Sequence, residues 1–204
     1  QMNKNTALHK ACALKTTTMP RQSFTQKDLH KAMTAFAQQR ARESTHHIIL
    51  ATHRPMTMEK ARYSLQKWDK LMNGQILGGR WNNKHHLHCE WVAFPEHVHS
   101  DPHWHLLWRM SDELEESTVN RMLRGRSIHD PKYDGRIKGQ MYHGLKWIVH
   151  RHWANVVSSG TTEVVEIFEP ERLGSYVTKQ QWDSLAYENV VTSREFKTRH
   201  LKAA

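Results

Sequence analysis

Cysteine is nearly absent from this chain, which has only Cys12 and Cys89 among 204 residues. Cys12 lies in a polar N-terminal segment and Cys89 in a predicted strand, so neither a disulfide framework nor a zinc ribbon is indicated. We therefore expect a reducing, intracellular location: the cytoplasm, or the nucleus in a eukaryote. The first residues also lack the apolar core of a signal peptide, so secretion is not expected.

Long apolar runs are missing too. No stretch approaches the roughly 20 apolar residues needed to cross a bilayer, so we expect no membrane partner. There is no Walker-type glycine-rich motif ending in lysine, so a helicase does not lie within this piece of chain. The length of 204 residues, with 38% hydrophobic and 25% charged residues, fits one large globular domain.

Acidic residues are outnumbered: 30 Lys and Arg stand against 20 Asp and Glu, a formal charge of +10. Such an excess favours a polyanionic partner, and nucleic acid is favoured over a membrane surface.

The chain divides into four expected segments. Residues 1–22 are polar and basic and predict a flexible arm, and residues 23–44 predict a helical extension that packs on the main domain. Thr25 and Asp28 resemble a capping box before a helix over residues 26–42. Residues 45–185 form the main domain, and residues 186–204 are expected to be a tail because their pattern is polar and less periodic.

Within the main domain the periodicity alternates between strands and helices. Strands are predicted at 46–52, 86–95, 103–108 and 163–168, and helices at 57–74, 112–123, 141–155 and from 170. The order β-α-β-β-α-α-β-α predicts an α+β fold with a mostly antiparallel sheet.

The segment Pro102–Trp108 contains a histidine pair, His103 and His105. Alternate side chains of a strand share a face, so both imidazoles project the same way, roughly 7 Å apart. Two imidazoles on a stiff strand suit a divalent metal ion. The pair alone is weak evidence, because the chain has 17 histidines.

The preceding predicted strand offers a carboxylate that could be the third metal ligand. If the hairpin turns near residues 96–98, Glu90 lies across from His103, which favours Glu90 as the third ligand. Glu96, His99 and His88 remain rival third ligands. Two imidazoles and one carboxylate with open positions suit Mg²⁺ or Mn²⁺, with Zn²⁺ also possible.

Tyr176 and Lys179 lie three residues apart on the last predicted helix and so reach the same side, with Gln180 next to them. A tyrosine hydroxyl is a poor nucleophile at its usual pKa of about 10. It can attack a phosphodiester when a metal polarises the phosphate and a cation supports the developing charge.

Together these motifs resemble those of the HUH endonucleases, the single-strand nicking enzymes of rolling-circle replication, transposition and conjugation. The family's His-hydrophobe-His appears as His103-Trp104-His105, and its Tyr-x-x-Lys as Tyr176-Val177-Thr178-Lys179, in the family's order over residues 46–183. A single tyrosine followed by lysine is more similar to replication initiators and Rep-like transposases than to relaxases. The family's usual third-ligand position is occupied by Pro95, with Glu96 beside it.

The resemblance implies a ferredoxin-like sheet and a metal-dependent enzyme that nicks and joins single-stranded or hairpin DNA through a 5′-phosphotyrosine. Tyr176 would be the nucleophile, Lys179 would stabilise charge, and His103, His105 and Glu90 would hold the metal. The resemblance further implies a helicase or host replication proteins as separate partners, and we expect a monomer or weak dimer. Two different functions would also suit the charge: a non-catalytic, histidine-rich nucleic-acid-binding regulator, and a protein that binds RNA hairpins.

Basic side chains along the domain are candidates for a groove that follows the phosphates of a nucleic acid. The candidates, with Gln180 added because it neighbours the tyrosine motif, are Arg54, Arg80, Lys84, Arg124, Arg126, Arg136, Lys138 and Gln180.

Overall fold

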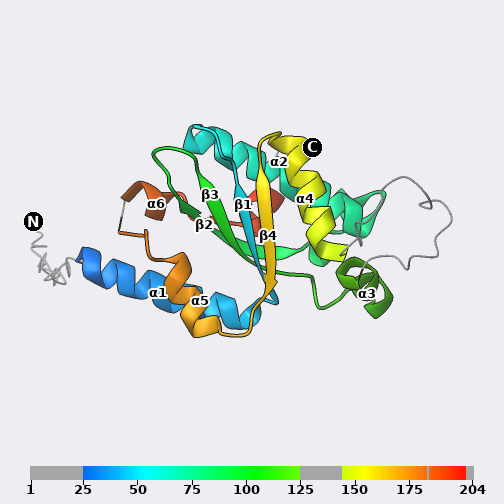
Figure 1. The fold of residues 1–204 in the computed structure, drawn as a ribbon. Helices are drawn as coiled ribbons and strands as arrows, with labels where there is room; N and C mark the ends of the chain where they lie inside the picture. The colour runs from blue at the N-terminus through cyan, green and yellow to red at the C-terminus, as the bar shows by residue number, and fades with distance from the viewer. Residues whose placement is uncertain (1–24, 125–143, 183, 201–204) are drawn as a thin grey trace, which may run out of the picture.

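One antiparallel sheet forms the centre of the domain (Figure 1), in a computed structural model that describes residues 25–124, 144–182 and 184–200. Its five strands have the order β4-β1-β3-β2-β5. They are β1 (His46–Ala51), β2 (Glu90–Glu96), β3 (His103–Arg109), β4 (Thr161–Glu166) and β5 (Val191–Thr192). The helices are α1 (Gln26–Glu43), α2 (Met58–Leu77), α3 (Glu116–Arg124), α4 (Gly144–Val156), α5 (Pro170–Val177), α6 (Ser184–Glu188) and α7 (Ser193–His200), with 3-10 turns η1 (Trp81–Asn83) and η2 (His85–Leu87).

The order of elements from β1 to α5 is the predicted one, so the prediction of an α+β fold with an antiparallel sheet flanked by helices is confirmed. None of the described helices is long and apolar enough to cross a membrane.

One face of the sheet is apolar along its whole length. Trp104, Leu106 and Trp108 of β3 alternate onto this face, where α2 and α4 cover them. Trp68 of α2 and Trp153 of α4 are fully buried in the same cluster. A core with this many large side chains fixes the position of β3, because each buried aromatic contributes a few kcal/mol to stability.

The other face is only partly apolar. Val92, Phe94 and Leu107 pack there against Ala37 and Ala41 of α1, together with Val177 of α5. This face leaves the start of β3, with its two histidines, outside the apolar cluster. Helices α1 and α5 lie side by side over it (Figure 1).

Close packing of α1 and α5 depends on a glycine. A Cβ added to Gly174 would lie 2.6 Å from the Cα of Gln38, closer than real Cβ contacts. Beside it, the Thr178 hydroxyl donates to the Gly174 carbonyl over 3.0 Å and lies 3.1 Å from the Thr34 hydroxyl. Helix α1 therefore fixes the position of α5, and the expected N-terminal helical extension does pack on the domain. The Thr25–Asp28 capping box is also present. The predicted arm at 1–22 lies outside the described residues.

Two predicted elements are shifted: α3 begins at Glu116 and not at residue 112, and β4 spans Thr161–Glu166 and not residues 163–168. Three further local expectations differ from the structure. Helix α2 continues past Asn73–Gly74 to Leu77 and ends at Gly78, whose φ of +70° favours glycine. Strand β2 begins at Glu90, since residues 85–87 form a 3-10 turn. The expected tail from residue 186 instead supplies, over its described part, β5 on the edge of β2 and the buried Val191 and Phe196.

Candidate functional site

His103 and His105 lie on the sheet face that α1 and α5 cover, as their alternation predicted. Strand β3 is the middle strand, and its first residues pair with the last residues of both neighbours: His103 lies opposite Ala51 of β1 and Glu96 of β2. Residues opposite each other share a face, so the end of β1, the end of β2 and the start of β3 bring their side chains together.

Glu96, and not Glu90, lies across from His103. The register pairs Glu90 with Arg109 at the far end of β2, so the expectation that placed Glu90 opposite His103 is wrong. The reason is the hairpin, which turns through residues 97–102, later than assumed. Glu96, a rival third ligand in the sequence, is the carboxylate that the fold brings to the histidine pair.

Both oxygens of the Glu96 carboxylate accept hydrogen bonds. His105 Nε2 lies 2.5 Å from Glu96 Oε2, and Lys179 Nζ and Gln180 Nε2 lie 2.8 and 3.1 Å from Glu96 Oε1. Hydrogen bonds from His105 and Lys179 outweigh partial burial and lower the pKa of Glu96 to about 2. Glu96 is therefore a carboxylate at neutral pH, surrounded by donors.

His47 extends this contact on the opposite side of the His105 ring. His47 Nε2 lies 3.1 Å from His105 Nδ1, and the two rings stack at 15°. Burial, and then the neighbouring His105, lowers the pKa of His47 to about 4, so His47 is neutral at pH 7. Because a carboxylate only accepts, His105 Nε2 donates to Glu96, and His105 Nδ1 on the other side of the ring shares a hydrogen bond with His47 Nε2.

Tyr176 lies at the edge of the histidine pair. Its ring centroid is 5.5 Å from that of His105 and 6.4 Å from that of His47, with the planes nearly perpendicular in both pairs. The side chain is 43% exposed, so its hydroxyl can meet a solvent-borne substrate. The structure therefore brings the predicted tyrosine and the predicted histidine strand together, although they are distant in sequence.

Lys179 joins Tyr176 to Glu96. Its Nζ lies 4.2 Å from the Tyr176 ring centroid, as well as 2.8 Å from Glu96. Burial lowers the pKa of Lys179, but Glu96 and Tyr176 together raise it above its usual value, so the amine stays charged. Gln180 completes the contact, because its side-chain oxygen accepts from the backbone N–H of His97 over 3.0 Å.

A second group of ligand-type side chains lies on the other side of His103. His53, Asp101 and His103 each offer one ligand atom, and these atoms lie within 4.8 Å of one another, which is close enough to hold a metal ion. Asp101 Oδ2 is 3.5 Å from His103 Nε2. Among the described residues this is the group of three such side chains that meets this spacing.

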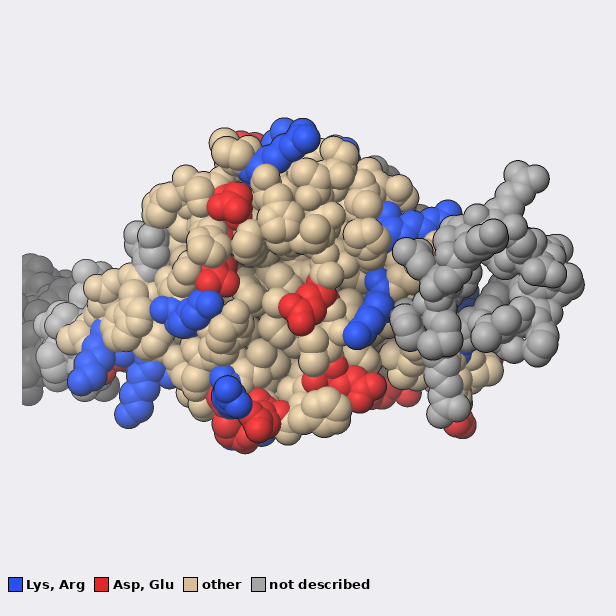
Figure 2. Space-filling model, viewed as in Figure 1, with Lys and Arg blue, Asp and Glu red and all other residues tan. Residues whose placement is uncertain are grey.

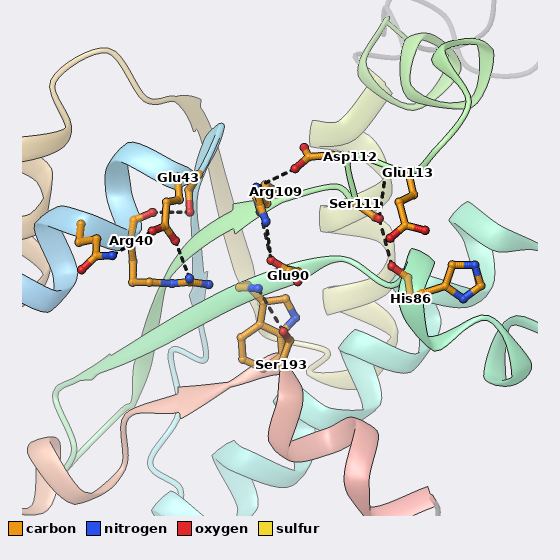
Figure 3. A network of polar contacts seen from close by, with 12 residues as sticks. Arg40, Glu43, His86, Glu90, Arg109, Ser111, Asp112, Glu113 and Ser193 are labelled. Atoms are coloured by element: carbon orange, nitrogen blue, oxygen red, sulfur yellow. Dashed lines mark hydrogen bonds and ion pairs between the residues drawn. The ribbon is translucent and has the colours of Figure 1, made fainter.

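Glu90 belongs to a different network, shown in Figure 3. Arg109 Nη2 lies 2.8 Å from Glu90 Oε2, and the same guanidinium reaches Asp112 over 3.0 Å. The hydrogen bond from Arg109 lowers the pKa of Glu90. This ion pair ties β2 to β3 and to the following turn, and it accounts for Glu90 without a metal.

His88 and His99, the remaining candidates for a third ligand, lie elsewhere. His88 is buried, with its Nε2 2.9 Å from the Trp81 carbonyl oxygen, near the end of α2. His99 is exposed in the loop between β2 and β3. Neither belongs to the group of His53, Asp101 and His103.

The basic candidates are dispersed. Arg54 is exposed and follows His53 directly. Arg80 and Lys84 lie beyond the end of α2, where Arg80 is exposed and Lys84 donates to the Leu77 carbonyl. Arg124 ends α3, and Arg126, Arg136 and Lys138 lie outside the described residues. On the face seen in Figure 2, Lys and Arg alternate with Asp and Glu and form no continuous band. Residues 1–24 and 125–143 hold eight Lys and Arg against two Asp, and so contribute much of the net charge.

Sequence reasoning missed His47, His53 and Asp101. His47 lies within β1, His53 comes two residues after its end, and Asp101 comes two residues before His103. The antiparallel pairing of β1 with β3 brings the end of β1, followed by His53, to the start of β3, preceded by Asp101. The same register places His47 opposite Leu107, two residues from His105 on the same face. That register, and not any local motif, was the signal that could have found these residues.

The fold and site define an α+β domain with a cluster of histidine and carboxylate side chains at one end of its sheet. No family model, no curated protein and no solved structure matches the chain.

Proposed function

We propose that this protein nicks and rejoins single-stranded DNA through a covalent bond to Tyr176. The main support is the position of the half-exposed Tyr176 ring against His105, with Lys179 touching both Tyr176 and Glu96. A phenol beside a fixed cation and a histidine–carboxylate pair is the arrangement needed for tyrosine attack on a phosphodiester.

The arrangement of elements supports the same proposal. The run β1-α2-β2-β3-α4-β4 and the strand order β4-β1-β3-β2 agree with a ferredoxin-like unit. The histidine pair lies on the middle strand, and the tyrosine helix covers the same face. This is the layout that the resemblance to HUH endonucleases implies, on residues that carry its two motifs.

In the proposed reaction, Tyr176 Oη attacks the scissile phosphorus and the bond from phosphorus to the 3′ oxygen breaks. The leaving strand ends in a 3′ hydroxyl, which takes up a proton, and the 5′ phosphate remains on the tyrosine. Attack by a 3′ hydroxyl on the phosphotyrosine reverses the step and joins strands. Lys179 supports the negative charge on the phenolate and on the phosphate, and Glu96 holds Lys179 in place.

The donor set beside Tyr176 fits a divalent ion, because imidazole nitrogens and carboxylate oxygens suit Mn²⁺, Zn²⁺ or Mg²⁺. Two candidate sets share His103, one with His105 and Glu96 and the other with His53 and Asp101. Of these, the set with His53 and Asp101 has ligand atoms close enough together for one ion. Such an ion would polarise the non-bridging oxygens of the phosphate. Proposed partners are therefore single-stranded or hairpin DNA and a divalent metal.

The experiment uses a randomised pool of single-stranded and hairpin oligonucleotides labelled at the 3′ end, with Mn²⁺ or Mg²⁺. Because the 5′ phosphate stays on the protein, the 3′ label should become bound to the protein and a 5′ label should not. Tyr176→Phe should give no labelled protein. Tyr63→Phe, which changes an exposed tyrosine on α2, should behave as the wild type.

Two results would contradict the proposal. One is labelled protein from Tyr176→Phe at the wild-type rate. The other is DNA binding by the wild type without any covalent product, which is the outcome expected of a non-catalytic nucleic-acid-binding regulator.

A further inference from the structure

The nitrogen of His103 that faces Asp101 has no hydrogen-bond partner. His103 Nε2 is buried, and no donor or acceptor among the described residues satisfies it. Asp101 Oδ2 lies 3.5 Å from it, which is longer than an ordinary hydrogen bond. Burying a ring nitrogen without a hydrogen-bond partner costs free energy, and a bound ligand at this position would remove that cost.

The separation of the two atoms fits a cation between them. Zinc binds imidazole nitrogen and carboxylate oxygen at about 2.0–2.2 Å, so two ligands at a tetrahedral angle lie roughly 3.4 Å apart. His103 Nε2 and Asp101 Oδ2 are separated by 3.5 Å. Octahedral ions such as Mg²⁺ have similar bond lengths but hold neighbouring ligands at 90°, which brings them nearer, to roughly 2.9 Å.

Surrounding contacts orient the three side chains. The Ser100 hydroxyl donates to Asp101 Oδ1 over 2.7 Å, which leaves Oδ2 facing His103. The Thr161 hydroxyl lies 2.6 Å from His53 Nε2 and holds that ring at the end of β1. The backbone of His53 has a φ of +52°, an uncommon value for a residue other than glycine. Such second partners commonly fix the ligands of metal sites.

Glu96 and His105 are satisfied without a metal. Both Glu96 oxygens accept hydrogen bonds, and His105 Nε2 donates its N–H to Glu96. A metal on His105 Nε2 would have to break that contact. Metal binding by His103 Nε2 breaks no such contact, because that nitrogen has no hydrogen-bond partner among the described residues.

We infer that His53, Asp101 and His103 form a binding site for a divalent transition-metal ion of the Zn²⁺ type, with at least one open coordination position. The site is separate from the Glu96–His105 pair and does not depend on the proposed nicking reaction, since cation binding is measured without DNA.

The test is a Co²⁺ titration of the folded protein, followed by the visible absorption of bound Co²⁺, with Zn²⁺ competition to rank affinities. His53→Gln and Asp101→Asn should each weaken binding at this site at least 10-fold. His99→Gln, a change at an exposed histidine of the same loop, should leave it unchanged. His105→Gln should change it less than about three-fold. Circular dichroism checks that each variant is folded, which is expected because His53 and Asp101 are at the surface.

Wild-type affinity in both His53→Gln and Asp101→Asn would overturn the inference, because the measured ion would then be bound elsewhere. Loss of binding in His105→Gln alone would overturn it too and would assign the ion to His105 and Glu96. Intact metal binding without any covalent DNA product would contradict only the proposed function.

Discussion

The two ends of strand β2 carry glutamates with opposite roles. At the start, Glu90 forms an ion pair with Arg109 in a network that joins neighbouring elements (Figure 3). At the end, Glu96 contacts His105, Lys179 and Gln180 beside an exposed tyrosine. The same residue type on the same strand thus joins neighbouring elements through an ion pair at one end, and lies in the candidate site at the other, which we propose to be the reactive end. The difference comes from what the register places opposite each glutamate.

Near the Glu90 end, the neighbouring Trp91 donates its indole N–H to Asp69 over 2.7 Å, and Asp69 is buried. Burial raises the pKa of Asp69 to about 7. The folded pKa lies above the unfolded value of 3.8, so between these values the folded protein holds an extra proton and loses stability as the pH rises.

The first and largest predicted effect follows from Asp69. From pH 4 to pH 8, the difference in free energy of unfolding between the wild type and Asp69→Asn should fall by on the order of 4 kcal/mol. Urea unfolding at a series of pH values measures this difference, and the shared titrations of other groups cancel in it. A difference independent of pH would show that this end of β2 does not rest on a protonated Asp69.

The second prediction concerns the reactive end. Glu96→Gln removes the charge that holds Lys179 and leaves one acceptor oxygen where His105 and Lys179 use two, so the rate of covalent adduct formation should fall roughly 100-fold. Single-turnover kinetics with labelled DNA measure the rate. Glu90→Gln is the matched control, since it makes the same change on the same strand. An equal fall in the rate of adduct formation in both variants would contradict the different roles proposed for Glu96 and Glu90.

The third effect is smaller. Glu90→Gln should lower the free energy of unfolding by less than about 1 kcal/mol, because its ion pair with Arg109 is partly exposed to solvent. Thermal and urea denaturation measure it, and adduct formation should stay within about two-fold of the wild-type rate. A larger kinetic than structural effect would give Glu90 a part in the chemistry after all.

The smallest predicted effect is on the affinity for single-stranded DNA, and it tests which end of the sheet the DNA contacts. Arg54 follows His53 at the reactive end, whereas Arg80 lies on the connection that leads into the Glu90 end. Arg54→Ala should weaken binding of single-stranded DNA about three-fold at physiological salt and reduce the salt slope by about one. Arg80→Ala should have less effect. Fluorescence anisotropy at several salt concentrations compares them, and the reverse ranking would move the DNA to the other end of the sheet.

Much of the fold could be predicted from local pattern. The capping box at Thr25, the strand at His46–Ala51 and the order of elements follow from periodicity and capping residues, which act over a few neighbours. The end of α2 was predicted too early, because Asn73 is held within the helix by Asp69. The polar composition of residues 186–200 hid a short edge strand whose stability comes from pairing with β2.

The site was predictable in part for the same reason. His103, His105, Tyr176 and Lys179 could be named because each pair lies within one short stretch of sequence. The choice between Glu90 and Glu96 could not be made, because it depends on where the hairpin turns, and a shift of pairing changes every opposite residue. His53 and Asp101 join His103 only through the pairing of β1 with β3, which no local pattern encodes.

The proposed covalent bond between Tyr176 and DNA is tested most directly by locating the DNA adduct by mass spectrometry. After reaction with the oligonucleotide pool and nuclease trimming, tryptic cleavage after Arg172 and Lys179 isolates residues 173–179, which contain Tyr176 as their only tyrosine. We expect a nucleotide 5′-phosphate on this peptide, formed with Mn²⁺ and absent from Tyr176→Phe. An adduct on another tyrosine, or none on any peptide from DNA-bound protein, would contradict it.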